Sequence, residues 1–258
     1  MTTTNDTAIR SPIALKNVAM FMAMTQRLID REPHLPNIGV FNGPSGYGKS
    51  FAGIFAANKV SARIIEVRDY WTRSSFWRAL CNELGIATRR TAENAEMAEQ
   101  AVERLAEDPR RPLIIDEADR LADKRMIEIA RDIADATGIP VILIGEERLP
   151  HKLLAFERIH NRVLDWYAAQ PSDLDDTRAL ATAIYPKLKF EEDLLDHVRR
   201  QSGGRPRRII TNLARIAENC RNRSVKQLSL DAFKDIELYT GQPPQPRAID
   251  LFEKSARA

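Results

Sequence analysis

Apolar residues along this chain alternate between short continuous runs and longer segments in which they recur every three or four positions. The short runs have the length and composition of buried strands and lie at 38–41, 63–67, 113–115, 141–144 and 163–168. The longer segments have the spacing of helices with one buried face and lie at 13–29, 51–60, 74–84, 93–106 and 124–136. This alternation predicts an α/β fold with a parallel five-stranded sheet flanked by helices.

The pattern becomes wholly helical after residue 171. We expect helices over 173–184, 191–201, 206–220 and 229–239, with Ser172 and Ser229 as N-caps. These helices predict a second, all-α domain after the α/β domain. The chain would then comprise an N-terminal tail and helix (1–36), an α/β domain (37–170), a small C-terminal all-α domain (171–240) and a flexible tail (241–258).

The segment after the first strand, residues 43–50, matches the phosphate-binding pattern G-x-x-x-x-G-K-[ST] at every required position, and we call it the phosphate-binding loop. Glycines let the backbone curl around an anion, so that N–H groups and the N-terminus of the next helix point at a phosphate. Lys49 would neutralise charge on the β- and γ-phosphates, and the Ser50 hydroxyl would bind Mg²⁺. We predict nucleotide contacts from Gly43, Pro44, Ser45, Gly46, Tyr47, Gly48, Lys49, Ser50 and Phe51.

The strand at 113–115 is followed at once by two acids, Asp116 and Glu117. At the carboxyl end of a parallel strand, these side chains would lie beside the phosphate-binding loop. Asp116 would hold Mg²⁺ through water, and Glu117 would polarise the water that attacks the γ-phosphate. The two motifs together predict an ATP hydrolase that uses Mg²⁺.

Composition and charge restrict the class of protein. With 43% hydrophobic and 29% charged residues among 258, the chain has the composition of a soluble globular protein, and no apolar run could span a bilayer. The N-terminus lacks a signal-peptide pattern, so we expect a cytoplasmic protein with no membrane partner. Cys81 and Cys220 lack the spacing of a disulfide framework or a zinc site. The net charge of +3 permits binding to nucleic acid but does not argue for it.

With these motifs, residues 38–235 resemble the AAA+ ATPases. The resemblance implies the P-loop NTPase fold with a helical lid, and ATP and Mg²⁺ at the site. In that family the strand after the acidic pair ends in a polar residue, often asparagine, that contacts the γ-phosphate or the attacking water. Glu146 holds the matching position, and this departure implies slow or differently arranged hydrolysis.

Three arginines match positions that act on the γ-phosphate in AAA+ proteins. Arg158 and Arg162 precede the last strand, four residues apart, where the resemblance implies an arginine that reaches into a neighbouring subunit's nucleotide site. Arg207 fits the G-x-x-R pattern at the start of a lid helix, where the family's arginine reaches the γ-phosphate. The resemblance therefore implies a homo-oligomer, either a ring or a helical filament.

Within the superfamily, the chain resembles the ATP-dependent target-DNA-selecting proteins of transposons, the phage Mu B family. The resemblance rests on residues 115–121, the strand end at 143–145, the arginine pair and the lid run 204–213. It implies binding to duplex DNA without sequence preference and presentation of that DNA to a transposase. Candidate DNA contacts are Arg73, beside Tyr70 and Trp71, and the pair Arg89 and Arg90.

Other classes of ATPase remain open at this stage. A helicase loader shares several of the same fragments, and a secretion-type ATPase would act on a protein partner. A small-molecule P-loop kinase would need neither the arginine pair nor a lid that carries Arg207.

Overall fold

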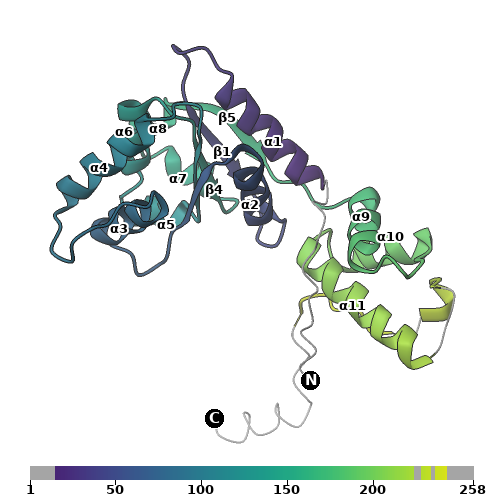
Figure 1. Ribbon diagram of the computed structural model, residues 1–258. Helices are drawn as coiled ribbons and strands as arrows, with labels where there is room; N and C mark the ends of the chain where they lie inside the picture. Colours follow the sequence, from purple (N-terminus) through teal and green to yellow (C-terminus); the bar gives the residue numbers. More distant parts are fainter. Residues whose placement is uncertain (1–14, 224–227, 234–235, 243–258) are drawn as a thin grey trace, which may run out of the picture.

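The computed structural model describes residues 15–223, 228–233 and 236–242. Five strands form one sheet in which every pairing is parallel, in the order β2-β3-β4-β1-β5. The strands are β1 (Ile38–Asn42), β2 (Arg63–Glu66), β3 (Leu113–Asp116), β4 (Val141–Gly145) and β5 (Val163–Ala168). The carboxyl ends of β1, β3 and β4 therefore lie side by side, with β4 between the other two (Figure 1).

The central strands are buried on both faces, as a parallel sheet covered by helices requires. Successive side chains point to opposite faces, so that Ile114 and Ile142 join one apolar cluster while Ile115 and Leu143 join the other. Each fully buried side chain of this size contributes roughly 1.5–3 kcal/mol to folding. The continuous apolar runs in the sequence thus supply both halves of the core.

Helices cover the two faces of the sheet. One face carries α1 (Lys16–Ile29) and α2 (Lys49–Val60), and the other carries α3 (Arg73–Glu83), α4 (Asn94–Ala106), α5 (Asp119–Asp123), α6 (Glu128–Thr137), α7 (Leu149–Leu153) and α8 (Glu157–His160) (Figure 1). Small residues bring α2 close to the sheet: a Cβ on Gly53 would lie 2.7 Å from Ile144 Cδ1. This close packing fixes the helix that begins directly after the phosphate-binding loop.

A second group of helices follows β5 and lies to one side of the sheet (Figure 1). It contains α9 (Leu174–Ile184), α10 (Glu192–Gln201), α11 (Pro206–Arg223) and a 3₁₀ turn, η1 (Asp231–Phe233). We refer to this group as the lid. Leu180, Leu195, Ile209 and Leu213 are buried in its interior.

Several predicted elements are wrong in detail. The helix predicted over 124–136 is α6, which begins four residues later, at Glu128, because Arg125 adopts φ +54 and separates it from α5, a short helix that was not predicted. The N-cap of α9 is Asp173 rather than Ser172, since the Asp173 side chain accepts the Asp176 N–H while the Ser172 N–H donates to the Gly204 carbonyl. The described part of 229–239 contains only η1 and not the predicted helix.

Within the described ranges, no helix combines the length and the apolar character needed to cross a bilayer. The predicted N-terminal tail and most of the C-terminal tail lie outside these ranges.

Candidate functional site

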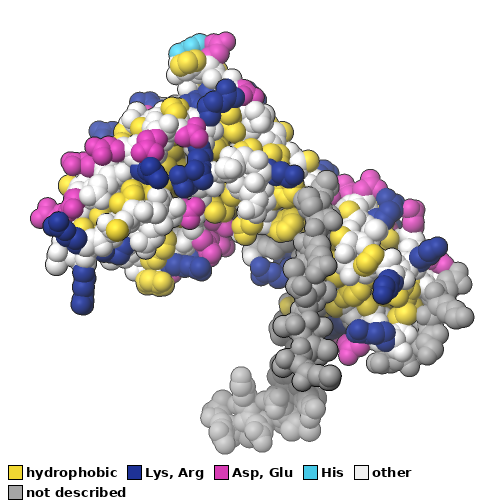
Figure 2. Space-filling model, in the orientation of Figure 1, with side chains coloured by type: hydrophobic (Ala, Val, Ile, Leu, Met, Phe, Trp, Pro, Cys, Tyr) yellow, Lys and Arg dark blue, Asp and Glu magenta, His cyan; other side chains and the backbone are white. Residues whose placement is uncertain are grey.

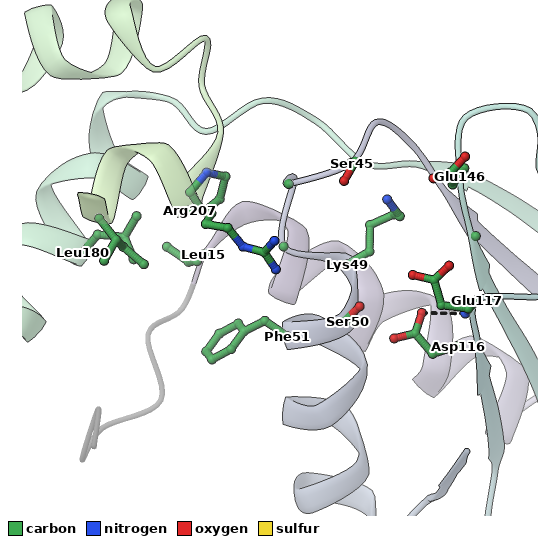
Figure 3. Close-up of a pocket in the computed structure, with 15 residues that line it drawn as sticks. Leu15, Ser45, Lys49, Ser50, Phe51, Asp116, Glu117, Glu146, Leu180 and Arg207 are labelled. Atoms are coloured by element: carbon green, nitrogen blue, oxygen red, sulfur yellow. Dashed lines mark hydrogen bonds between the residues drawn. The ribbon is translucent and has the colours of Figure 1, made fainter. Parts of the chain in front are cut away.

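A cleft of about 360 Å³ opens where the phosphate-binding loop, the strand ends and the lid meet (Figure 3). Its lining comes from four sources: the loop and the first turn of α2, the ends of β3 and β4, the lid, and Leu15 at the start of α1. The charged lining residues are Lys49, Asp116, Glu117, Glu146 and Arg207. Sequence positions far apart are therefore brought to one site by the parallel sheet and the lid.

The loop owes its shape to glycines in backbone conformations that other residues rarely adopt. Gly46 has φ +87 and Gly48 has φ +79. A Cβ on Gly43 would lie 2.9 Å from the Ala169 Cβ, so only glycine fits between the loop and the end of β5. The Lys49 ammonium donates to the carbonyls of Gly43 (2.7 Å) and Pro44 (3.0 Å) and is thereby held at the mouth of the loop.

Burial lowers the pKa of Lys49, and the nearby carboxylates, Asp116 first among them, act in the opposite direction. The ammonium thus gives up part of its hydration on folding, which favours its pairing with an anion in the cleft.

The two acids after β3 lie at the cleft in different environments. Asp116 is buried, and its Oδ1 accepts the Glu117 N–H at 2.8 Å. Glu117 has φ +57, a strained conformation for a non-glycine residue, and its carboxylate lies 3.6 Å from the Arg120 guanidinium. Burial and then the neighbouring Asp116 raise the pKa of Glu117, although Arg120 opposes this shift. These properties suit Asp116 to a fixed role and Glu117 to proton transfer.

Glu146 follows β4 and presents an exposed side chain to the cleft. Its backbone N–H donates to the buried Asp119 Oδ2 at 2.5 Å. Asp119 in turn lies 3.4 Å from the Lys152 ammonium on α7. The position of Glu146 is therefore fixed by contacts beneath it, whereas its carboxylate is free to face the cleft.

The lid reaches the phosphate-binding loop through the start of α11. Pro206 Cγ lies 3.7 Å from where a Cβ on Gly48 would stand, and Arg205 Cδ lies at the same distance from the Gly46 position. Arg207 lines the cleft, and Figure 3 shows its side chain extending from the lid toward the loop. The predicted arginine of the lid thus lies opposite the acids of the sheet.

Sequence reasoning missed a set of hydrogen bonds at the first turn of α1, which we call the α1 joint because it connects the phosphate-binding loop to the lid. The Asn17 amide donates to the carbonyls of Tyr47 and Gln170, and its carbonyl accepts the Gln170 N–H, each at 2.8 Å. One residue earlier, the Lys16 N–H donates to Asp176 of α9 at 2.8 Å. This turn connects the phosphate-binding loop, the segment after β5 and the lid, and only a contact map, not a local pattern, could have revealed it.

Arg158 and Arg162 lie away from this cleft. They share a shallow surface cavity with Arg131. Their spacing of four residues predicts that both lie on one helix face, and this prediction is wrong, because α8 ends at His160, before Arg162. Arg162 pairs with Asp135 at 2.9 Å. Arg158 is exposed and has no recorded partner within the described part of the chain.

The candidate DNA contacts are exposed. Arg73 is the first residue of α3, and Arg89 and Arg90 lie in the loop between α3 and α4. The Arg78 guanidinium donates to the backbone carbonyls of Arg89 and Arg90 at 3.0 and 3.3 Å. The loop is thus fixed through its backbone while both arginine side chains face solvent.

Known proteins share this architecture. Residues 31–153 match a family described as AAA domain, and no curated protein matches the sequence. The fold is similar to that of Cdc6p from Pyrobaculum aerophilum, with a TM-score of 0.61 and 17% identity over 86% of this chain and 66% of that one.

Two further structures are similar. One is Orc1 from Aeropyrum pernix, in complex with DNA (TM-score 0.60, 17% identity, 87% of this chain and 64% of that one). The other is the RuvB Holliday junction branch migration motor of Thermotoga maritima (TM-score 0.56, 15% identity, 85% and 67%). The chain thus spans just under two thirds of the length of the Cdc6p and Orc1 structures. These similarities, together with the parallel sheet and its strand order, show the P-loop AAA+ fold.

Proposed function

We propose that this protein is an AAA+ ATPase that binds duplex DNA without sequence preference when it holds ATP, assembles on that DNA and presents it to a transposase. The observation that carries the ATPase part is the meeting of Lys49, Asp116, Glu117 and Arg207 at one cleft. A structural lysine or a chance acidic pair would have no reason to lie opposite an arginine carried by a separate helical lid.

The residues of the cleft divide the work. The backbone of the phosphate-binding loop and Lys49 hold the β- and γ-phosphates, while the Ser50 hydroxyl and the Asp116 carboxylate offer the oxygen ligands that Mg²⁺ prefers. Mg²⁺, when bound, neutralises phosphate charge. Glu117 accepts a proton from the attacking water, a role that its raised pKa favours, and Arg207 stabilises the γ-phosphate from the lid.

A neighbouring subunit would complete the site, and Arg158 is the better candidate for this contact. Arg162 would have to give up its ion pair with Asp135 to reach another chain, whereas Arg158 forms no ion pair with any residue that the structure describes. Mixing a Lys49→Ala protein with an Arg158→Ala protein should restore part of the ATPase activity, because the mixed oligomers contain some intact interfaces. Recovery with Arg162→Ala but not with Arg158→Ala would reverse the assignment.

The DNA part of the proposal rests on exposed arginines and on what is known of the proteins with similar structures. The face shown in Figure 2 mixes basic and acidic side chains without a broad patch of one sign, so we assign DNA contact to individual loops that carry Arg73, Arg89 and Arg90. Such contacts track phosphates and carry no sequence information. The Orc1 structure was solved with DNA and RuvB is a branch migration motor, which favours DNA over protein as the substrate.

The test measures binding to unrelated duplexes with a non-hydrolysable ATP analogue, with ADP and with no nucleotide. We expect strong binding only with the analogue, and none for Lys49→Ala. Removal of Arg89 and Arg90 together should weaken binding equally on all duplexes and lower the slope of log affinity against log salt by about one to two.

A matched control removes Arg104 and Arg110, which are exposed near the amino-terminal end of β3, opposite the cleft. This double variant should bind DNA like the parent. Equal affinity in all three nucleotide states would instead favour an ATPase that acts on a protein, such as a helicase loader or a secretion-type ATPase. Without stimulation of a transposase by the ATP-bound protein on DNA, the transposition role would fail even if DNA binding held.

A further inference from the structure

The strand order places Glu146 beside the start of the phosphate-binding loop, where the γ-phosphate of the proposed ATP would lie. Strand β4 runs between β1, which leads into the phosphate-binding loop, and β3, which leads into Asp116 and Glu117. In the β1–β4 register Asn42 lies opposite Gly145, so Glu146 follows directly beside the start of the loop. A phosphate chain that begins at the loop and extends toward the acids of β3 therefore passes the end of β4 at its last phosphate.

The position of Glu146 is built into the fold rather than left to a flexible loop. A Cβ on Gly145 would lie 2.4 Å from both Asp119 Oδ2 and Leu149 Cδ2, so this strand end packs directly onto the residues beneath it. The 2.5 Å hydrogen bond from the Glu146 N–H to Asp119 fixes the next residue. The Glu146 side chain is consequently the part that extends toward the cleft (Figure 3).

A carboxylate at this place has a definite electrostatic effect. Asp116 and Glu117 already bring two negative groups to the cleft, and Glu146 adds a third near the single ammonium of Lys49. ATP differs from ADP by a γ-phosphate at the end of the chain, so a negative side chain beside that end repels ATP more than ADP. An uncharged amide there would bind the same phosphate without this repulsion.

We propose that Glu146 sets nucleotide specificity by repelling the γ-phosphate. A single subunit would then prefer ATP to ADP less strongly than it would with asparagine or glutamine at this position. The proposal rests on the ATP site proposed above. It makes ATP retention depend on additional cations, from Mg²⁺ or from a second copy of the chain.

The experiment measures the affinities of the purified full-length protein for ADP and for the β,γ-imido analogue of ATP, both with Mg²⁺, by calorimetry without DNA. Glu146→Gln and Glu146→Asn should each raise the preference for the ATP analogue over ADP by on the order of tenfold, as expected for one unit charge across a partly buried cleft. Glu147→Gln is the matched control, because it removes the same charge from the next residue, which is exposed and does not line the cleft. Its preference should equal that of the parent.

An unchanged or lowered preference in both Glu146 variants would overturn the inference, and so would an equal rise in Glu147→Gln, which would indicate a general charge effect. Failure of the folded parent to bind either nucleotide would instead overturn the proposed function. Glu146 is exposed, so thermal melts of all three variants should match the parent and exclude misfolding as the cause of a difference.

Discussion

Replacing Asn17 with alanine should loosen the joint between the phosphate-binding loop and the lid. The substitution removes three hydrogen bonds of 2.8 Å and leaves the Tyr47 carbonyl and both backbone groups of Gln170 without this partner. Asn17 is only 5% exposed, so water would not readily replace its amide. At about 1 kcal/mol of net stability for each bond, the free energy of unfolding should fall by about 3 kcal/mol.

Urea denaturation followed by tryptophan fluorescence measures this loss. Gln26→Ala is the matched control on the same helix, since its exposed hydrogen bond to Asp30 should contribute less than about 0.5 kcal/mol. Asn17→Asp keeps an acceptor for the Gln170 N–H but turns a carboxylate toward two carbonyl oxygens, so it should destabilise at least as much as alanine. A loss below about 1 kcal/mol for Asn17→Ala, or a milder effect of aspartate, would refute the reasoning.

Other substitutions test packing and ionisation. Gly145→Ala should lower stability by about 1–3 kcal/mol, because the added methyl would overlap Asp119 and Leu149. Gly53→Ala should lower stability less, because its nearest neighbour is a terminal methyl and alanine gains about 1 kcal/mol over glycine in helix propensity. Equal shifts in melting temperature for the two variants would contradict the packing argument. Burial raises the pKa of Asp176 above its ordinary 3.8, so the contribution of Asp176 to stability should fall as pH rises from about 4 through the raised value. Asp176→Asn should make the free energy of unfolding less dependent on pH in this range. Parallel profiles of unfolding free energy against pH for parent and variant would contradict this prediction.

The strands and the phosphate-binding loop could be predicted because their signals are local. Each strand is a continuous apolar run, and every described strand falls within one or two residues of its predicted limits. The meeting of Asp116 with Lys49 at the cleft could also be predicted, since parallel strands place their carboxyl ends at one edge of a sheet.

What escaped prediction depends on conformation or on contacts across the chain. The break between α5 and α6 rests on a positive φ at Arg125, where the sequence offers no glycine or proline to mark it. Arg162 lies beyond α8 because that helix ends after a single turn, although its spacing from Arg158 fits one helix face. The role of Asn17 rests on a hydrogen bond to a residue 153 positions away, and no local pattern encodes such a pairing.

In the proposed ATP site, the contacts at the first turn of α1 and the charges of the cleft would both affect how closely the lid lies to the phosphates. The sheet contributes carboxylates, whereas Arg207 is carried by the lid, and in the proposed ATP site it would offset γ-phosphate charge only when α11 stays against the loop. Asn17 holds that arrangement from the opposite side by fixing Tyr47 to the segment that leads into the lid. Asn17→Ala should therefore weaken binding of an ATP analogue more than binding of ADP at temperatures where the variant remains folded. Equal weakening of both nucleotides would mean that the joint supports the loop alone and does not position Arg207.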